Sequence, residues 1–363
     1  MKYTTHTLTP EQKESLFNKH KDLIYIIHSC GDMMLRKQIK RLYHLLFPEV
    51  SETTIEFDIA ELICTGFLLQ KQIQKPSRTQ MLYLSKYPRS HFYEKKNTGD
   101  VPALSFSVTK IYYQIFATDY LITKIIPDMI AQNFMITMEN IIIYLNWIGS
   151  NLLTPNNYCG NYDFYKNVCA ALQSNFRLSE DFARDMVIAE NEMERSLHIL
   201  STKNKDYPIC KEKKQRDIER DSYLSDNERQ KYFYNLKNFA KCGFIFEGVS
   251  GNTIKIAFFD HQNSIQHKKL WTNLSYILLM FQRYCNNYDV ELQATVYVYD
   301  EDRRKHLVKE ECTEGYDFYR QELTGLPKKQ QVMRDIGVKA QFWDSIHTQY
   351  KINPVFENYN IQP

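Results

Sequence analysis

Residues 51–72, SETTIEFDIAELICTGFLLQKQ, decide how the N-terminal part of this chain is interpreted. Ser51 belongs to the residue types that cap helix N-termini well. Aliphatic residues then recur at the spacing of one helical face, namely Ile55, Ile59, Leu62 and Ile63. Gly66 is typical of the position just after a helix end. The stretch therefore predicts a helix that is followed directly by a β-strand.

The segments on either side complete a recognisable order of elements. A first helix is predicted to begin at Pro10 and to end at Gly31, and a second to end before Pro48. After the central helix, FLLQKQI and TQMLYLS are predicted as two strands joined by a turn at residues 74–78. Three helices followed by a hairpin are the order of a winged helix-turn-helix. We therefore predict a winged-helix domain over residues 1–95.

The rest of the chain predicts three further regions. Residues 100–200 are predicted to be helical, and the part from Val101 to about Leu153 is unusually apolar, which fits either a bundle core or a dimerisation surface. Residues 201–231 carry charges of both signs and predict a linker or an exposed helix. Residues 232–363 predict an α/β domain, with a helix from Gln266 to Tyr284 and a mainly helical tail from Tyr316 onward. The expected fold class is α+β and helix-rich.

Composition sets the broad class of the protein. The 363 residues are 43% hydrophobic and 25% charged, as in soluble globular proteins, and the net charge is +3. No apolar run approaches the roughly 20 residues of a membrane span. The eight cysteines form no CxxC pair. We expect a cytoplasmic protein without a membrane partner, with reduced thiols, and with neither a metal site nor a cofactor.

The distribution of charge indicates DNA. No Asp or Glu occurs from Leu62 to Tyr93. An acid-free basic segment favours a phosphate backbone, because each neutralised phosphate releases counterions. Basic residues of the second helix are spaced so that several can share one solvent face. The predicted phosphate contacts are Arg36, Lys37, Lys40 and Arg41 on the second helix, and Lys71, Lys75, Arg78, Lys86 and Arg89 on the wing.

The third helix, which reads bases in most winged helices, is acidic. It carries Glu52, Glu56 and Asp58, and it has no Lys or Arg. We therefore expect sparse base reading, through the small hydroxyl residues Ser51, Thr53 and Thr54 at its start. The alternative is a winged helix that docks or scaffolds another protein.

The segment from Asp22 to Lys86 resembles the winged-helix part of the replication-relaxation family of plasmids and conjugative elements. The resemblance lies in DLIYIIHSCGDMMLRKQIKRLYHLLFPEVSETTIEFDIAELICTGFLL, which closes on MLYLSK. The later stretch IKIAFFDHQNSIQHKKLWTNLSYILLMFQRY is similar to the family's C-terminal strand-Asp-helix segment. Both matches are spacing patterns. The resemblance implies a DNA-binding accessory, regulator or initiator of plasmid replication or transfer.

A nuclease or relaxase-like enzyme is a third alternative. Asp260 ends one predicted strand and Glu291 opens another, and paired carboxylates can hold Mg²⁺. Gln293, however, stands where a catalytic Lys would be. We expect Asp260 to cap the next helix, His261 and His267 to be solvated or to cap, and the basic run 303–306 to be a solvated turn rather than a DNA contact. No catalytic residue is predicted.

These observations predict a sequence-specific protein that binds double-stranded DNA as a homodimer. Its expected setting is the replication, transfer or transcription control of a mobile element. A dimer matches a palindromic site by symmetry.

Overall fold

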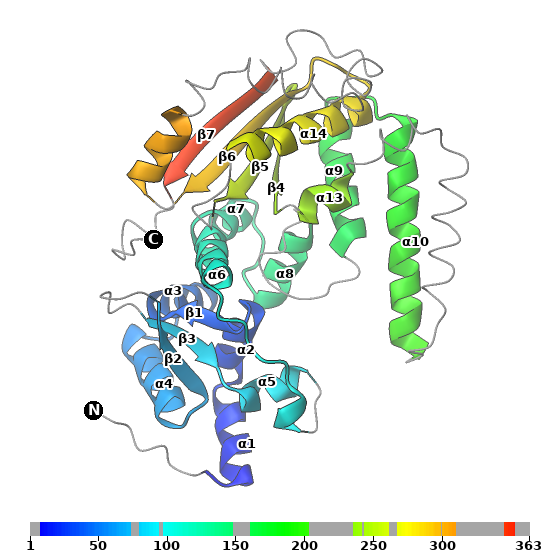
Figure 1. The fold of residues 1–363 in the computed structure, drawn as a ribbon. Coiled ribbons are helices and arrows are strands. Elements are labelled where there is room, and N and C mark those ends of the chain that lie inside the picture. Colours follow the sequence, from blue (N-terminus) through cyan, green and yellow to red (C-terminus); the bar gives the residue numbers. More distant parts are fainter. Residues whose placement is uncertain are drawn as a thin grey trace.

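The computed structural model describes residues 8–73, 80–93, 97–147, 160–202, 235–241, 243–260, 267–298, 300–309 and 345–352. Within these ranges the chain is rich in helices and has two separate β-sheets, which agrees with the expected α+β class (Figure 1). Across the same ranges, every helix is too short or too polar to traverse a lipid bilayer.

The first sheet belongs to the N-terminal module, which we define as residues 8–93. Its strands are in the order β1-β3-β2, and both pairings are antiparallel. The elements of the module are α1 (Pro10–Lys19), α2 (Lys21–Ser29), β1 (Met33–Leu35), α3 (Arg36–Leu46), α4 (Glu52–Cys64), β2 (Leu68–Gln72), β3 (Gln80–Leu84) and α5 (Lys86–Phe92).

Several local predictions for this module are confirmed. Ser51 caps α4, because its Oγ accepts a hydrogen bond from the Thr54 N–H at 3.1 Å. Gly66, directly after α4, has φ +75, a left-handed conformation that glycine adopts without strain. The predicted first helix is divided into α1 and α2, because His20 leaves helical geometry with φ −111 and ψ 23. Neither β1 nor α5 was predicted.

The middle of the chain is helical. Its elements are α6 (Val108–Tyr120), the π-helical turn η2 (Leu121–Ile125), α7 (Ile126–Ala131), α8 (Met138–Trp147), α9 (Gly160–Gln173), α10 (Glu180–Thr202) and α13 (Leu236–Lys241). Ser179 lies directly before α10, and its Oγ accepts a hydrogen bond from the Phe182 N–H at 3.4 Å. The predicted linker, from residue 203 onward, lies outside the described residues.

The second sheet forms the C-terminal part. It contains β4 (Ile245–Ser250), β5 (Thr253–Phe259), β6 (Glu291–Val298) and β7 (Ile346–Ile352), with α14 (His267–Cys285) between β5 and β6. The strand order is β4-β5-β6-β7, with β4 antiparallel to β5 and the other pairs parallel. Residues 346–352 were expected to be helical. They form a strand because Ile346 and Tyr350 are buried beside β6.

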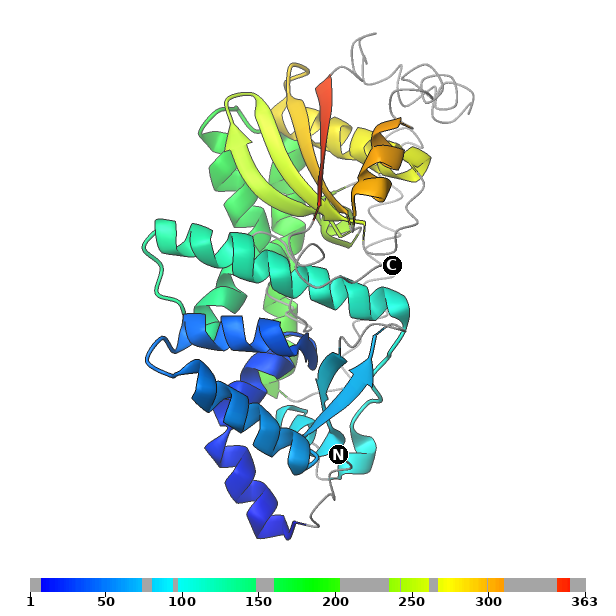
Figure 2. The ribbon, with the colours of Figure 1, turned by 90° about the vertical axis from the view of Figure 1, so that its left-hand side faces the viewer.

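Helix α6 lies between the N-terminal module and the second sheet (Figure 2). On one side, Gly31 comes so close to α6 that a Cβ atom there would lie 2.5 Å from Gln114 Oε1. On the other side, the Phe259 ring of β5 lies 5.7 Å from that of Phe116 and 5.3 Å from that of Tyr120. The apolar density of α6 is therefore used for packing inside one chain.

Two hydrophobic cores result. The first joins the N-terminal module to α6, η2, α7 and α8, and it reaches the sheet at Ala257 and Phe259. The second joins α9, α10, α13 and α14 to the opposite face of the sheet, at Ile254 and Ile256. The two faces alternate along β5 because successive strand residues point to opposite sides. The domain boundary predicted at residues 95–100 therefore does not separate the two hydrophobic cores.

Candidate nucleic-acid interface

The acidic residues of α4 lie along its two flanks, and Glu52 at its start is exposed. On the flank that faces α3, Arg36 Nη1 lies 3.2 Å from Glu56 Oε2. Lys40 Nζ lies 3.2 Å from Glu52 Oε2 and 3.1 Å from Glu56 Oε1. The hydrogen bonds that Lys40 donates to Glu56 and to Glu52 raise the pKa of Lys40. The two glutamates of this flank are thus matched by two cations of α3.

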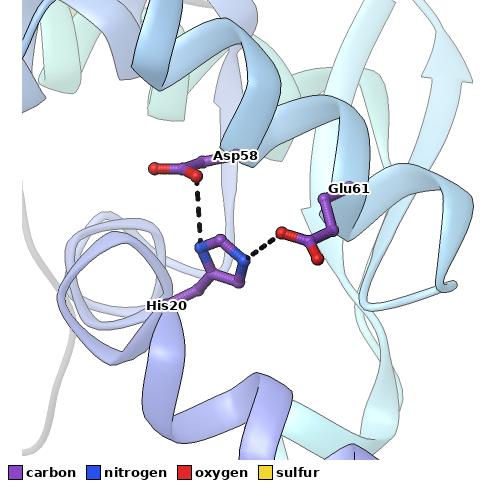
Figure 3. A group of neighbouring side chains, drawn as sticks. All are labelled: His20, Asp58 and Glu61. Carbon is purple, nitrogen blue, oxygen red and sulfur yellow. Dashed lines mark hydrogen bonds and ion pairs between the residues drawn. The ribbon is translucent and has the colours of Figure 1, made fainter.

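The other flank of α4 contacts the junction between α1 and α2 (Figure 3). The His20 ring, only 3% exposed, has its Nε2 2.8 Å from Glu61 Oε2 and its Nδ1 3.7 Å from Asp58 Oδ1. Lys19 Nζ also lies 2.6 Å from Glu61 Oε2. The hydrogen bond from Lys19, followed by that from His20, lowers the pKa of Glu61. These contacts hold α4 against the start of α2.

The residues His20, Asp58 and Glu61 are of types that bind metal ions, and one ligand atom of each lies within 4.8 Å of the others. The two carboxylates, however, face opposite nitrogens of the imidazole ring (Figure 3). A histidine binds a metal ion through one ring nitrogen, while the other nitrogen is bonded to an orienting group. This arrangement therefore fits a histidine that bridges two carboxylates better than a three-ligand site for one ion.

The outermost line of α4 is uncharged. Thr53, Phe57 and Ala60 are all exposed, and the Phe57 side chain is 71% exposed. They follow one another at steps of four and three residues, so they share one helical face, opposite the buried Ile55, Ile59 and Leu62. We call Thr53, Phe57 and Ala60 the α4 crest. The acidic appearance of this helix in the sequence does not extend to its crest.

The four basic residues predicted on the second helix share the solvent side of α3. Arg36, Lys37 and Arg41 are exposed, and Lys40 is half-buried. Arg36 and Lys40 lean toward α4 and its glutamates. Lys37 and Arg41 lie farther round the helix, on the side away from Arg36. The sequence predicted the shared face, but it did not show that Arg36 and Lys40 are paired with carboxylates of α4.

The predicted wing residues have different surroundings. Lys71 is half-buried on β2, with its Nζ 4.3 Å from the centroid of the Phe106 ring, a cation–π contact. Lys86 is exposed at the start of α5. Lys75 and Arg78, in the turn between β2 and β3, lie outside the described residues. At the start of α4, Ser51, Thr53 and Thr54 are exposed, and the hydroxyls of Ser51 and Thr54 lie 2.9 Å apart.

Arg89 does not contact DNA, contrary to the prediction from sequence. It is 3% exposed, and its Nε lies 2.9 Å from Asp32 Oδ2. The other carboxylate oxygen of Asp32 lies 2.7 Å from His28 Nδ1. Asp32 itself has φ 66, a left-handed conformation that aspartate tolerates better than most residues. Arg89 therefore holds α5 to the turn after α2, where no phosphate can reach its guanidinium.

The two carboxylates of the nuclease alternative lie at opposite ends of the second sheet. Strands β5 and β6 are parallel, with Thr253 opposite Glu291 and Phe259 opposite Tyr297. Asp260 directly follows Phe259, so about seven residue steps of about 3.3 Å, roughly 23 Å, separate it from Glu291. One metal ion cannot be shared over that distance. This pair of carboxylates is therefore not a metal site.

Asp260 is a partner of Arg303 rather than a helix cap. Its carboxylate is 1% exposed, and Arg303 Nε donates to its Oδ2 at 2.7 Å. The next helix, α14, begins only at His267. The basic run 303–306, expected to be a turn, belongs to a helix over residues 301–309. His261 and the side chain of His267 lie outside the described residues.

Comparison of the chain with family models, with curated proteins and with solved structures found no match.

Proposed function

We propose that the N-terminal module is a winged helix that binds double-stranded DNA, with α4 in the major groove and the β2–β3 hairpin as the wing. The observation that carries this proposal is the uncharged α4 crest, because an exposed acidic crest would repel phosphate. The order of elements α2-β1-α3-α4-β2-β3 and the sheet order β1-β3-β2 support it. So does the exposed N-terminus of α4, since side chains there face base edges in helix-turn-helix proteins.

The proposed phosphate contacts are predicted basic residues whose side chains are at least partly exposed. Lys37, Arg41 and Lys86 are exposed, and Lys71 reaches the surface of β2. Lys75 and Arg78 remain proposed contacts from the sequence alone. Arg36 and Lys40 contribute less, because their charge is already compensated by Glu52 and Glu56. We keep replication, transfer or transcription control of a mobile element as the proposed setting, on the strength of the resemblance to the replication-relaxation family.

Fluorescence anisotropy with random and AT-rich duplexes at several salt concentrations tests DNA binding. We expect the logarithm of the affinity to fall linearly with the logarithm of the salt concentration. In the triple variant Lys37→Ala/Arg41→Ala/Lys71→Ala, the slope should decrease by about 0.9 for each phosphate that is no longer neutralised. The matched control is Lys166→Ala/Arg184→Ala/Lys305→Ala, which removes the same charge far from α4. Absence of binding at low salt, or equal losses of affinity in both variants, would contradict the proposal.

A docking site for another protein is the second candidate, and one observation favours it. Phe57 is 71% exposed and lies with Ala60 on the uncharged crest, and an apolar surface rimmed by polar residues can contact a protein partner. If no duplex binds at low salt, and Phe57→Ser makes the protein more soluble, these results would support the docking of another protein and not DNA binding.

The proposed homodimer needs an apolar surface that is not already used inside the chain. Such side chains lie at the turn between α7 and α8, where Ile130 is 52%, Phe134 is 40% and Met135 is 71% exposed. We expect light scattering after gel filtration to give twice the chain mass of 43.3 kDa. Ile130→Ser/Met135→Ser should halve the measured mass, whereas Phe57→Ser should leave it unchanged. A single-chain mass at all concentrations would refute the dimer.

A further inference from the structure

We infer that the α4 crest recognises the C5-methyl groups of thymine, so that the module selects sites with thymines facing α4. This inference rests on the proposed DNA binding. It adds the chemical class of base that the helix reads, which the hydroxyl residues predicted from the sequence do not specify.

The chemistry of the crest excludes the usual hydrogen-bonded readout. Arg or Lys bonds guanine, and Asn or Gln bonds adenine, through paired hydrogen bonds. The crest has none of these residue types, and its only polar group is the Thr53 hydroxyl. What it offers is the Thr53 methyl, the Phe57 ring and the Ala60 methyl. The one apolar group that a base pair presents in the major groove is the thymine methyl, and Ala, Thr and Phe are residues that contact it.

The length of the crest suits a short run of bases. Thr53 and Ala60 are seven residues apart, which at about 1.5 Å per residue is about 10 Å along the helix axis. Successive bases of one DNA strand rise by about 3.4 Å. The crest can therefore meet about three consecutive base pairs.

The flanks of α4 support the same assignment. Glu56, beside the crest, offers only acceptor oxygens, so it can accept from the amine of cytosine or adenine but cannot bond guanine. Its pairing with Arg36 and Lys40 keeps the flank close to neutral, so that the helix can enter a groove lined with phosphates. Arg36 and Lys40 of α3, which could otherwise bond guanine, are held by Glu52 and Glu56.

The test uses 2′-deoxyuridine, which differs from thymidine only in lacking the C5-methyl group. A duplex is first selected from a random library with the full-length protein. Anisotropy then compares it with duplexes in which individual thymines are replaced by deoxyuridine. We expect about a four-fold loss of affinity for each methyl that the crest contacts, the value for one buried methylene converted to a ratio. Base pairing and phosphate contacts stay the same.

Variants of the crest identify which side chain makes the contact. Phe57→Ala should weaken binding to the thymine duplex and should remove the penalty for deoxyuridine at the position that Phe57 faces. This non-additivity is the sign of a direct contact. Phe57 is 71% exposed, so its substitution should leave the circular dichroism spectrum and the unfolding midpoint unchanged. Lys37→Ala/Arg41→Ala is the control, since it should weaken binding but keep the full deoxyuridine penalty.

The outcomes separate the inference from the function on which it rests. Salt-sensitive binding that is indifferent to deoxyuridine and to Phe57→Ala would overturn thymine recognition and leave DNA binding in place. A deoxyuridine penalty that persists in Phe57→Ala at every position would assign the methyl contact to another part of the protein, and would also overturn the inference. Absence of salt-sensitive binding to any duplex would defeat both.

Discussion

Replacing Arg89 with alanine is expected to lower the free energy of unfolding of the N-terminal module by about 3–5 kcal/mol, the usual cost of removing one partner from a buried ion pair. Arg89 is 3% exposed and Asp32 is 4% exposed, so the carboxylate would be left in the protein interior without its cation. The hydrogen bond from His28 alone does not compensate for this loss. The effect is large because the desolvation of Asp32 persists while its main partner is removed.

Urea unfolding followed by circular dichroism measures this difference. The matched control is Lys86→Ala, since Lys86 lies on the same short helix but is exposed, and its removal should change stability by less than about 0.5 kcal/mol. Arg89→Lys keeps the charge but changes the donor geometry, so its stability should fall between the two. Equal stabilities of Arg89→Ala and Lys86→Ala would show that the ion pair with Asp32 does not hold α5 in place.

Asp260→Ala is expected to produce the second large effect, a destabilisation of the C-terminal sheet by about 3–5 kcal/mol. Asp260 is 1% exposed at the end of β5, and Arg303 Nε lies 2.7 Å from its Oδ2. Removing the carboxylate leaves the guanidinium of Arg303, itself 9% exposed, without this partner in a largely buried position. The double variant Asp260→Ala/Arg303→Ala should cost less than the sum of the single variants, because the two residues act on the same contact.

The same substitution separates a structural carboxylate from a catalytic one. Asp302→Ala is the control, because Asp302 lies beside Arg303 on the same helix but is less buried than Asp260. Thermal and urea unfolding should show a loss of stability for Asp260→Ala and almost none for Asp302→Ala. Magnesium-dependent DNA cleavage that disappears in Asp260→Ala without any loss of stability would contradict the structural role of Asp260. It would support the nuclease alternative instead.

The α4 helix shows why a count of charges along a sequence misrepresents a surface. Glu52, Glu56, Asp58 and Glu61 make the helix acidic overall. The partners of Glu56 and Glu61 lie 20 and 42 residues away, on α3 and α1. A helix distributes seven consecutive residues over its whole circumference, so residues close in sequence face different neighbours. The two flanks and the crest are distinguishable only when those neighbours are known.

The elements with local signals could be predicted from the amino-acid sequence. The α4 helix, its cap at Ser51, the glycine at 66, the strands β2 and β3, and the β5–α14–β6 order follow from hydrophobic period, capping chemistry and turn residues. These signals act over a few residues, and each is encoded where it acts. The shared solvent face of Arg36, Lys37, Lys40 and Arg41 was predictable for the same reason.

The roles of the charged residues, by contrast, depend on contacts between distant parts of the chain. β1 is a strand because it pairs with β3, almost fifty residues later, and its three residues carry no strand signal of their own. Arg89 meets Asp32 across 57 residues, and Arg303 meets Asp260 across 43. Whether a charge is buried and paired or left at the surface depends on which elements meet. Which elements meet is decided by how the apolar residues of both cores can be buried together, and no local pattern in the sequence specifies it.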